Sequence, residues 1–468
     1  MTTNQRRRKI GVFSQGGLKN LGDEVLFAAV LQNVRARIPN AEIIGFTVNP
    51  EDTNQRHGIP AFPVCRLDTV ANGGSSATAS PVPHNASQTP TSAWKQRIKA
   101  IPGLVTIVRG IRRLIHVARE VILEPRFLWQ SYQRLRGVEL LLVAGSQQLN
   151  DIYGAWAFPV TLYKWSLLSR FTGTKFVMLS VGAGPITSPL SRFFIRGALR
   201  RCSYRSYRDS ISRELVESIG VKGSNPVFPD LAYSLKLPSP RAIPAEGGRD
   251  VVVGINPVPF YDGRYWATSN PGRYAEYVEK FARFTEWLSQ KNYSTLFFPT
   301  QLRADALTIE DIRGVLAGNG GAGRLLKGGF IQTLDDLVTE ISRADLVIAN
   351  RYHGILIALA LNKPVIGVAY HEKSRALLEQ VGQGEYVLDV SNFRTEDLIE
   401  KITALHANAL QSKEKIGRRI APLCEALERQ YDMVFALIGI ASPGPASSAA
   451  HHSAELAPSD VEPARQSI

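Results

Sequence analysis

An arginine and a histidine follow a strongly apolar segment in the second half of the chain. Residues 344–350 read Ala-Asp-Leu-Val-Ile-Ala-Asn, and Arg351, Tyr352, His353 and Gly354 come directly after them. This pattern predicts a buried parallel strand that ends at the start of a helix, where open α/β sheets bind their ligands. An arginine there can grip phosphate or carboxylate, and a histidine can transfer a proton near neutral pH. The alternative is that these residues only cap a helix.

A glycine-rich turn near the amino terminus is a second candidate for ligand binding. Segment 14–24 joins the first predicted strand to the first predicted helix and contains Asn20 and Asp23. It is neither a Walker loop nor a regular dinucleotide fingerprint. Free amides at a helix start favour anions, and the two polar side chains could hold sugar hydroxyls or transfer protons. The alternative is a tight turn in which Asp23 caps the helix.

Polar side chains also follow the apolar strand predicted over 138–144. Gln147, Asn150 and Asp151 lie just beyond it, so they are expected at the carboxyl end of a buried strand. Amide and carboxylate groups there are suited to binding hydroxyls. Asp151 could instead cap a helix.

Arg208 and Asp209 follow a further predicted strand over 203–207, and Asp230 ends the last predicted strand of the first half. An arginine at a strand end can bind an anion. The alternatives are a local ion pair in which Asp209 caps the next helix, and a turn formed by Asp230.

Two series of alternating strands and helices must position these residues, so we predict an α/β fold with two Rossmann-like domains that face a cleft. A single long doubly wound sheet is the rival architecture. We expect an N-terminal domain over 1–237, a linker over 237–248, a C-terminal domain over 249–441 with a long final helix, a disordered tail over 442–468 and a flexible insert near 68–92. The predicted strands cover 9–14, 41–48, 138–144, 175–181, 203–207, 226–228, 250–256, 294–299, 324–327, 345–350 and 364–370.

The composition of the chain limits its class and its partners. The 468 residues carry a formal net charge of +14, which suggests anionic partners. Three scattered cysteines suggest neither a disulfide framework nor a metal site, and fit a reducing cytoplasm. No apolar run approaches the ~20 residues of a membrane span, and no signal peptide is recognisable. We expect a cytoplasmic protein that needs no metal and no cofactor.

The order of these motifs resembles that of the polysaccharide pyruvyl transferase family. The likeness runs from about residue 10 to 382 without the insert near 68–136, through Gly-Gly-x-x-Asn-x-Gly-Asp-Glu, Gly-x-x-x-Leu-x-Asp, Gly-x-Gly-Pro, Arg-Asp-Ser, Pro-Asp and Arg-x-His-Gly. The resemblance implies a GT-B-like fold and transfer of a pyruvyl group from phosphoenolpyruvate to sugar hydroxyls as a ketal. The chain departs from the family where Gly145-Ser146-Gln147-Gln148 replaces a glycine-rich turn, which bears on the identity of the acceptor.

The resemblance and the chemistry together suggest roles for these residues. Arg351, with Gly354 beside it and Arg208 as a second contact, would bind the phosphate and carboxylate of the donor. His353 would act as the acid or donate a hydrogen bond to the phosphate. Asp23 or Asp151 would accept a hydroxyl proton, and we expect Asn20, Gln147 and Asn150 to bind the acceptor.

Two other functions fit the same pattern. A GT-B glycosyltransferase that uses a nucleotide sugar would share the architecture, because a fold does not decide the donor. A nonenzymatic binder of an anionic polymer would use the net charge, but the basic residues are spread out and we expect no nucleic-acid partner.

The segment 101–123 predicts a basic amphipathic helix. Arg109, Arg112, Arg113 and Arg119 form a basic stripe at helical spacing, beside a stripe of apolar residues at similar spacing. The helix could pack on the first domain and expose its arginines. The alternative is peripheral contact with the cytoplasmic face of the inner membrane, close to a sugar or lipid-linked oligosaccharide acceptor.

Overall fold

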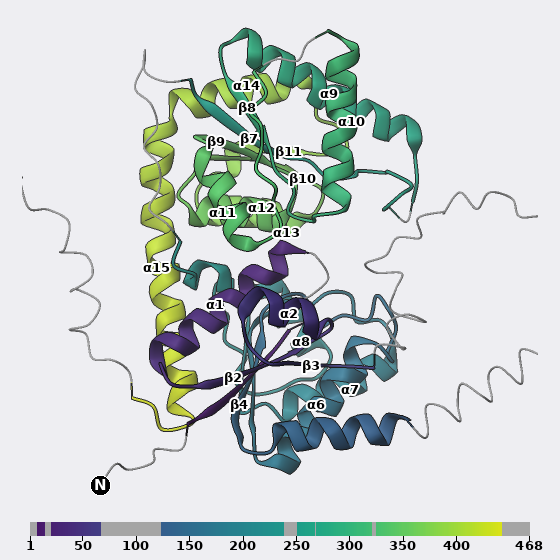
Figure 1. Ribbon diagram of the computed structural model, residues 1–468, viewed down its shortest axis with the longest axis vertical. Coiled ribbons are helices and arrows are strands. Elements are labelled where there is room, and N and C mark those ends of the chain that lie inside the picture. The colour runs from purple at the N-terminus through teal and green to yellow at the C-terminus, as the bar shows by residue number, and fades with distance from the viewer. Residues whose placement is uncertain are drawn as a thin grey trace, which may run out of the picture.

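Two parallel β-sheets form the centre of the molecule, one from each half of the chain (Figure 1). The computed structural model describes residues 7–14, 20–66, 123–237, 250–266, 268–320 and 324–441. Strands such as β4 (Val138–Ala144) and β9 (Leu346–Ala349) are apolar on both faces, because helices cover both faces of a parallel sheet. The two Rossmann-like units and their GT-B-like arrangement are therefore as the sequence predicts.

The first unit, residues 7–237, carries six strands in the order β3-β2-β1-β4-β5-β6. This is a doubly wound order whose direction reverses between β1 and β4, and ligands bind beyond the carboxyl ends of the strands at such a point. Its other elements include β1 (Lys9–Phe13), α1 (Leu21–Arg37), β2 (Glu42–Thr47), α2 (Pro50–His57), β3 (Ala61–Pro63), α6 (Phe158–Thr172), β5 (Lys175–Val181), α7 (Pro189–Arg200), β6 (Tyr204–Tyr207), α8 (Ser210–Ser218) and the 3₁₀ turn η3 (Leu231–Ser234). Residues 123–135 are also helical.

The second unit, from residue 250, carries five strands in the order β11-β10-β9-β7-β8, with the reversal between β7 and β9. Its elements are β7 (Val252–Asn256), α9 (Pro271–Gln290), β8 (Ser294–Phe297), α10 (Ala304–Gly318), α11 (Leu334–Arg343), α12 (Tyr352–Ala360), β10 (Val365–Ala369), α13 (Glu372–Gln380), η4 (Gly384–Tyr386), β11 (Val387–Asp389), α14 (Thr395–Ala407) and α15 (Ala409–Ala436).

The final helix, α15, runs along both units (Figure 1). Near its carboxyl end Glu428 and Asp432 form ion pairs with Arg37 of α1, at 2.6 and 3.0 Å. The last turns of the helix therefore pack on the first unit, although the sequence places them in the C-terminal domain.

The two units share one apolar core. Val25 of α1 and Ile357 of α12 belong to the same buried cluster, together with Val338 of α11. A backbone hydrogen bond also joins the two units directly, since the Leu21 amide donates to the Thr300 carbonyl at 3.0 Å. These contacts fix the strand ends of one sheet relative to those of the other.

The predicted elements agree with the structure except at a few places. The segments 226–228 and 324–327 each form only a single bridge, to Tyr207 and to Thr295, instead of strands. The short elements α2, β3, α13 and β11 and the longer helix α14 were absent from the prediction. The predicted insert near 68–92, the basic helix over 101–123, the linker beyond residue 237 and the tail over 442–468 lie outside the described residues.

Candidate active site

The candidate residues gather where the carboxyl ends of strands from both sheets meet. Asp23 follows β1 and Ser146 follows β4, the strands on either side of the reversal in the first sheet. His353 follows β9, which lies beside the reversal in the second sheet. The site is therefore built from the switch points of both units.

Asp23 is held by two hydrogen bonds at the start of α1. The Asn20 side-chain amide donates to its Oδ2 atom at 2.9 Å, and the Ser146 hydroxyl donates to Oδ1 at 2.9 Å. Asn20 is also the helix cap, because its Oδ1 accepts from the Gly22 amide at 3.1 Å. The helix cap is therefore Asn20, three residues before the alternative cap Asp23. The Asp23 carboxylate is left to face the junction of the two units.

Ser146 reaches Asp23 through an unusual backbone conformation. Its φ of 60° and the φ of 44° at Gly145 place two successive residues in the left-handed region. A non-glycine residue there is strained, and such strain concentrates at functional sites.

The His353 imidazole lies directly over Gly22, so that a Cβ atom at Gly22 would be 2.2 Å from His353 Nδ1. Only glycine permits this approach between α12 and α1. The Nε2 atom of His353 is buried and has no hydrogen-bond partner among the described residues. A buried unpaired ring nitrogen is costly, which makes it a candidate to contact a substrate.

Burial and mutual attraction set the protonation of Asp23 and His353. Burial raises the pKa of the Asp23 carboxyl, and this outweighs the lowering effects of His353 and Ser146. Burial likewise lowers the pKa of His353, against the raising effect of Asp23. Both shifts favour neutral groups, so the two residues are suited to exchanging one proton.

Arg208 brings a buried cation from the first unit to His353's helix. Its guanidinium lies 4.9 Å from the centre of the Tyr352 ring, and its nitrogens lie 3.5 Å from Asp209 and 3.6 Å from Asp230. Its Nε atom has no hydrogen-bond partner in the described part of the chain. Gly182 permits this placement, because a Cβ there would lie 2.8 Å from that atom. Arg208 is thus a buried cation near two carboxylates, and its Nε–H group has no acceptor among the described residues.

Lys373 is a second cation at the junction, and sequence reasoning missed it. It lies at the start of α13, and its Nζ donates to the Ala183 carbonyl of the first unit at 3.3 Å. Burial, with Arg208 nearby, lowers its pKa to about 8. Its position just after the predicted strand 364–370 was the available signal. The amide of Lys373 is capped by His371, whose pKa is also lowered by burial.

Arg351 does not present its planar fork to a ligand as the sequence suggested. Its Nε and one terminal nitrogen donate to Asp305 at 3.0 and 2.6 Å, and Asp305 is fully buried. Burial alone would lower the pKa of Arg351, but the Asp305 carboxylate raises it. The side chain is 24% exposed, so the remaining edge of the guanidinium stays a cation near the site. Because Nε and one terminal nitrogen already donate to Asp305, that edge of the guanidinium is not available for the bidentate contact with the donor that the sequence predicted.

Gly354 has a packing role in the structure, and its predicted role in donor binding stays a prediction. A Cβ atom there would lie 2.6 Å from Oδ1 of Asn256, at the end of β7. The glycine lets α12 pack against that strand end.

Asp151 and Asn150 are occupied in their own loop. Oδ2 of Asp151 accepts from the amides of Thr187 and Ser188, both at 2.8 Å, and its pKa is lowered because these bonds outweigh the effect of burial. Asn150 donates to the Gln147 carbonyl at 2.6 Å and accepts from the Ile152 amide at 3.2 Å. The structure therefore favours the alternative in which Asp151 organises the start of α7.

Gln147 remains available at the edge of this loop. Its side-chain amide lies against Gly184, where a Cβ would be 2.4 Å from its Nε2 atom. It is half-buried and directly follows Ser146, so it is next to the Asp23 network.

Among the described residues, no group of three or more His, Cys, Asp and Glu side chains is placed to hold a metal ion. In the same residues, no helix is long and apolar enough to cross a membrane.

Known proteins match this chain in sequence and in fold. A family model described as polysaccharide pyruvyl transferase matches residues 20–372. The amylovoran biosynthesis protein AmsJ of Erwinia amylovora is 19% identical over 318 residues, which is 63% of this chain and 72% of that protein.

Solved structures align with this one at low sequence identity. The S. aureus MnaA–UDP co-structure aligns with a TM-score of 0.51 at 10% identity and covers 94% of this chain and 99% of that one. A glycosyltransferase from Rickettsia africae aligns with a TM-score of 0.49 at 10% identity, covering 92% and 99% of the two chains.

Proposed function

Since the chain belongs to the polysaccharide pyruvyl transferase family and is a sugar-modifying transferase, we propose that it moves a pyruvyl group from phosphoenolpyruvate to two hydroxyls of a sugar, forming a ketal. The observation that carries this proposal is the Asp23–His353 pair beside two cations, the buried Arg208 and the half-buried Lys373. That set combines proton transfer with the binding of a small anion.

The donor carries a phosphate and a carboxylate, so it needs fixed positive charge in a site with little water. Arg208 and Lys373 come from opposite units and act on each other electrostatically, which places two cations together. In our proposal they bind these two groups, and the partly exposed Arg351 cation adds positive charge nearby.

The reaction requires two proton movements that balance. The His353–Asp23 pair protonates the methylene carbon of phosphoenolpyruvate, which becomes a methyl group, and the first sugar hydroxyl bonds to the central carbon. The proton of that hydroxyl returns to the pair. The bond from carbon to the phosphate oxygen then breaks, the second hydroxyl closes the ketal, and its proton leaves with the phosphate.

The acceptor is expected beside the loop that carries Ser146 and Gln147. The Ser146 hydroxyl is already bonded to Asp23, so a sugar hydroxyl next to it would be within reach of the proton acceptor. A sugar or lipid-linked oligosaccharide in exopolysaccharide or cell-envelope synthesis is our proposed acceptor. Peripheral attachment to the cytoplasmic face of the membrane rests on segment 101–123 and stays a sequence prediction.

A donor comparison tests the proposal. The purified protein is incubated with a saccharide panel and either phosphoenolpyruvate or UDP-sugars, because a fold neighbour was solved with UDP. We expect phosphate release with phosphoenolpyruvate and a saccharide mass that increases by one pyruvate less one water. Transfer of a hexose from UDP-hexose, without phosphate release from phosphoenolpyruvate, would establish the glycosyltransferase alternative.

A further inference from the structure

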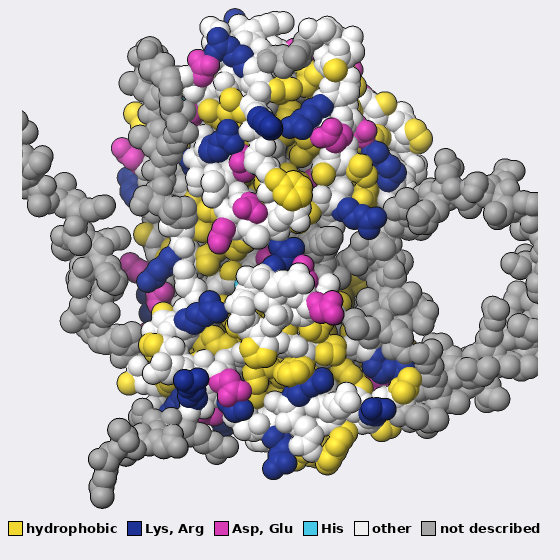
Figure 2. Space-filling model, in the orientation of Figure 1, with side chains coloured by type: hydrophobic (Ala, Val, Ile, Leu, Met, Phe, Trp, Pro, Cys, Tyr) yellow, Lys and Arg dark blue, Asp and Glu magenta, His cyan; other side chains and the backbone are white. Residues whose placement is uncertain are grey.

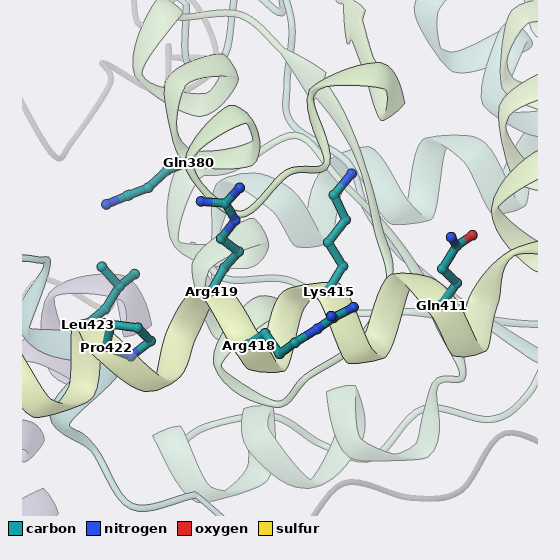
Figure 3. Close-up of a pocket in the computed structure, with 7 residues that line it drawn as sticks. All are labelled: Gln380, Gln411, Lys415, Arg418, Arg419, Pro422 and Leu423. Carbon is teal, nitrogen blue, oxygen red and sulfur yellow. The ribbon is translucent and has the colours of Figure 1, made fainter.

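A basic cavity lies between α13 and α15, away from the candidate active site. Its volume is about 720 Å³, and none of the described residues that line it is acidic. Lys415 and Arg419 project toward the side on which Gln380 lies, and Arg418 extends along the helix toward Lys415 (Figure 3). Three cations of one helix thus line a single hollow.

The charges of this cavity are not neutralised within the described chain. Lys415, Arg418 and Arg419 form no ion pair there, and Arg418 has one long bond, from Nε to the Glu414 carbonyl at 3.4 Å. By contrast, Arg429 further along α15 is paired with Glu425 at 3.8 Å. Neighbouring unpaired cations repel one another, so a bound anion would stabilise them.

The position of Lys415 depends on a glycine. Gly382 has a φ of 73°, and a Cβ atom there would lie 2.5 Å from Cε of Lys415 and 3.3 Å from its Nζ. The lysine stem therefore lies across the turn that follows α13. On the face shown in Figure 2, Lys and Arg side chains are instead dispersed among hydrophobic and acidic ones.

We propose that this cavity binds a diphosphate group. A single carboxylate would leave two of the three cations unmatched, whereas a diphosphate carries several charges and oxygens for both arginine forks. Gln380 and Gln411 line opposite ends of the cavity, where their side-chain amides add neutral hydrogen-bond donors (Figure 3). Pro422 and Leu423 provide an apolar edge beside the charges.

The cavity is separate from the candidate active site but connected to it by one helix. Lys373 and Gln380 are seven residues apart on α13, about 10 Å along its axis. The binding proposed here does not depend on the reaction proposed above, so it can be tested without donor or acceptor.

Inorganic pyrophosphate is the probe for the test, at about 0.15 M salt, where weak surface attraction is screened. Two readouts are combined: calorimetric titration, and acylation of lysines followed by mass spectrometry of each peptide. We expect pyrophosphate to slow the acylation of Lys415 at least tenfold while exposed lysines elsewhere react as before. The triple variant Lys415→Gln, Arg418→Gln, Arg419→Gln should lose binding at least tenfold in Kd.

A matched control variant also removes three positive charges, at positions outside the cavity. The variant Arg283→Gln, Arg394→Gln, Arg429→Gln changes three cations that are 53, 70 and 66% exposed and already paired. It should bind as wild type does. No protection of Lys415, or an equal loss of affinity in both triple variants, would overturn the proposal.

A second arm separates a lipid source from a soluble one. Phosphatidylcholine vesicles with and without geranylgeranyl diphosphate are compared with soluble pyrophosphate for protection of Lys415. Protection by the diphosphate vesicles supports a lipid-linked ligand, and protection by pyrophosphate alone supports a soluble diphosphate.

Discussion

Asp23 of α1 and His353 of α12 face each other across the junction of the two units, because the His353 ring rests on Gly22, next to Asp23. Each residue changes the pKa of the other, and neither could do so if the units were apart. The packing of α12 on α1 therefore assembles the proposed acid–base pair.

The contact at Gly22 predicts a large effect of one methyl group. Gly22→Ala would place Cβ 2.2 Å from Nδ1 of His353 and displace the ring, so we expect phosphate release to fall at least ~100-fold. Gly314→Ala in α10 is the matched control, since a Cβ there meets nothing within 4 Å. It should leave the rate unchanged and stabilise its helix by up to about 1 kcal/mol. Equal rates for both variants would remove His353 from the mechanism.

The lowered pKa of Lys373 predicts a pH dependence of donor binding. Its cation is present below about pH 8 and is lost above it, so the KM for phosphoenolpyruvate should rise as the pH increases through 8. Lys373→Arg should move this rise to higher pH, because arginine stays charged. A KM profile that is the same in both proteins would show that Lys373 does not contact the donor.

The same shift has a consequence for stability. The unfolded chain holds this proton up to about pH 10.5 and the folded chain only to about 8. Between these pH values the unfolded chain binds one proton more than the folded chain, so the free energy of unfolding should increase with pH. The variant Lys373→Met should lack this increase. Urea titrations across this range measure the difference.

The ion pair of Arg351 and Asp305 predicts a structural cost for substitutions at Arg351. Asp305 is fully buried and also accepts from the amides of Thr300 and Gln301, at 3.1 and 2.8 Å. Arg351→Gln should lower the free energy of unfolding by about 3 kcal/mol. Arg313→Gln, in an exposed pair with Glu310, should change it by less than about 1 kcal/mol. Similar small effects in denaturant titrations would leave Arg351 free for the donor.

Metal removal is expected to leave activity unchanged, since positive side chains neutralise the donor in our proposal. Activity is measured after dialysis against a chelator and again with added Mg²⁺ or Mn²⁺. Activity that disappears with the chelator and returns with the metal would contradict the proposed role of Arg208 and Lys373.

Local pattern was sufficient to predict the strand and helix that present Arg351 and His353. A run of apolar residues followed by a helix start is specified within a dozen residues of sequence, as 344–354 shows. The short helix α13 was missed because six of its nine residues, Glu372–Gln380, are polar and its apolar residues are confined to 376–378. Lys373 was missed with it.

The partners of the candidate residues could not be predicted from local pattern. Arg351 meets Asp305 and Asp23 meets Ser146 through tertiary contacts between distant segments. Asp151 had both a capping and a catalytic interpretation, and only the positions of the Thr187 and Ser188 amides decide between them. The contact of His353 with Gly22 depends on how two domains pack, which no spacing within one domain specifies.

The most direct test of the central claim is pyruvyl transfer in D₂O by wild type, His353→Gln and His406→Gln. His406 bonds to Tyr293 in the second unit and serves as the matched histidine control. We predict that wild type and His406→Gln release phosphate from phosphoenolpyruvate and yield a ketal with one solvent deuterium in its methyl group. His353→Gln should fold normally and be at least ~100-fold slower. Full-rate transfer by folded His353→Gln would contradict the account.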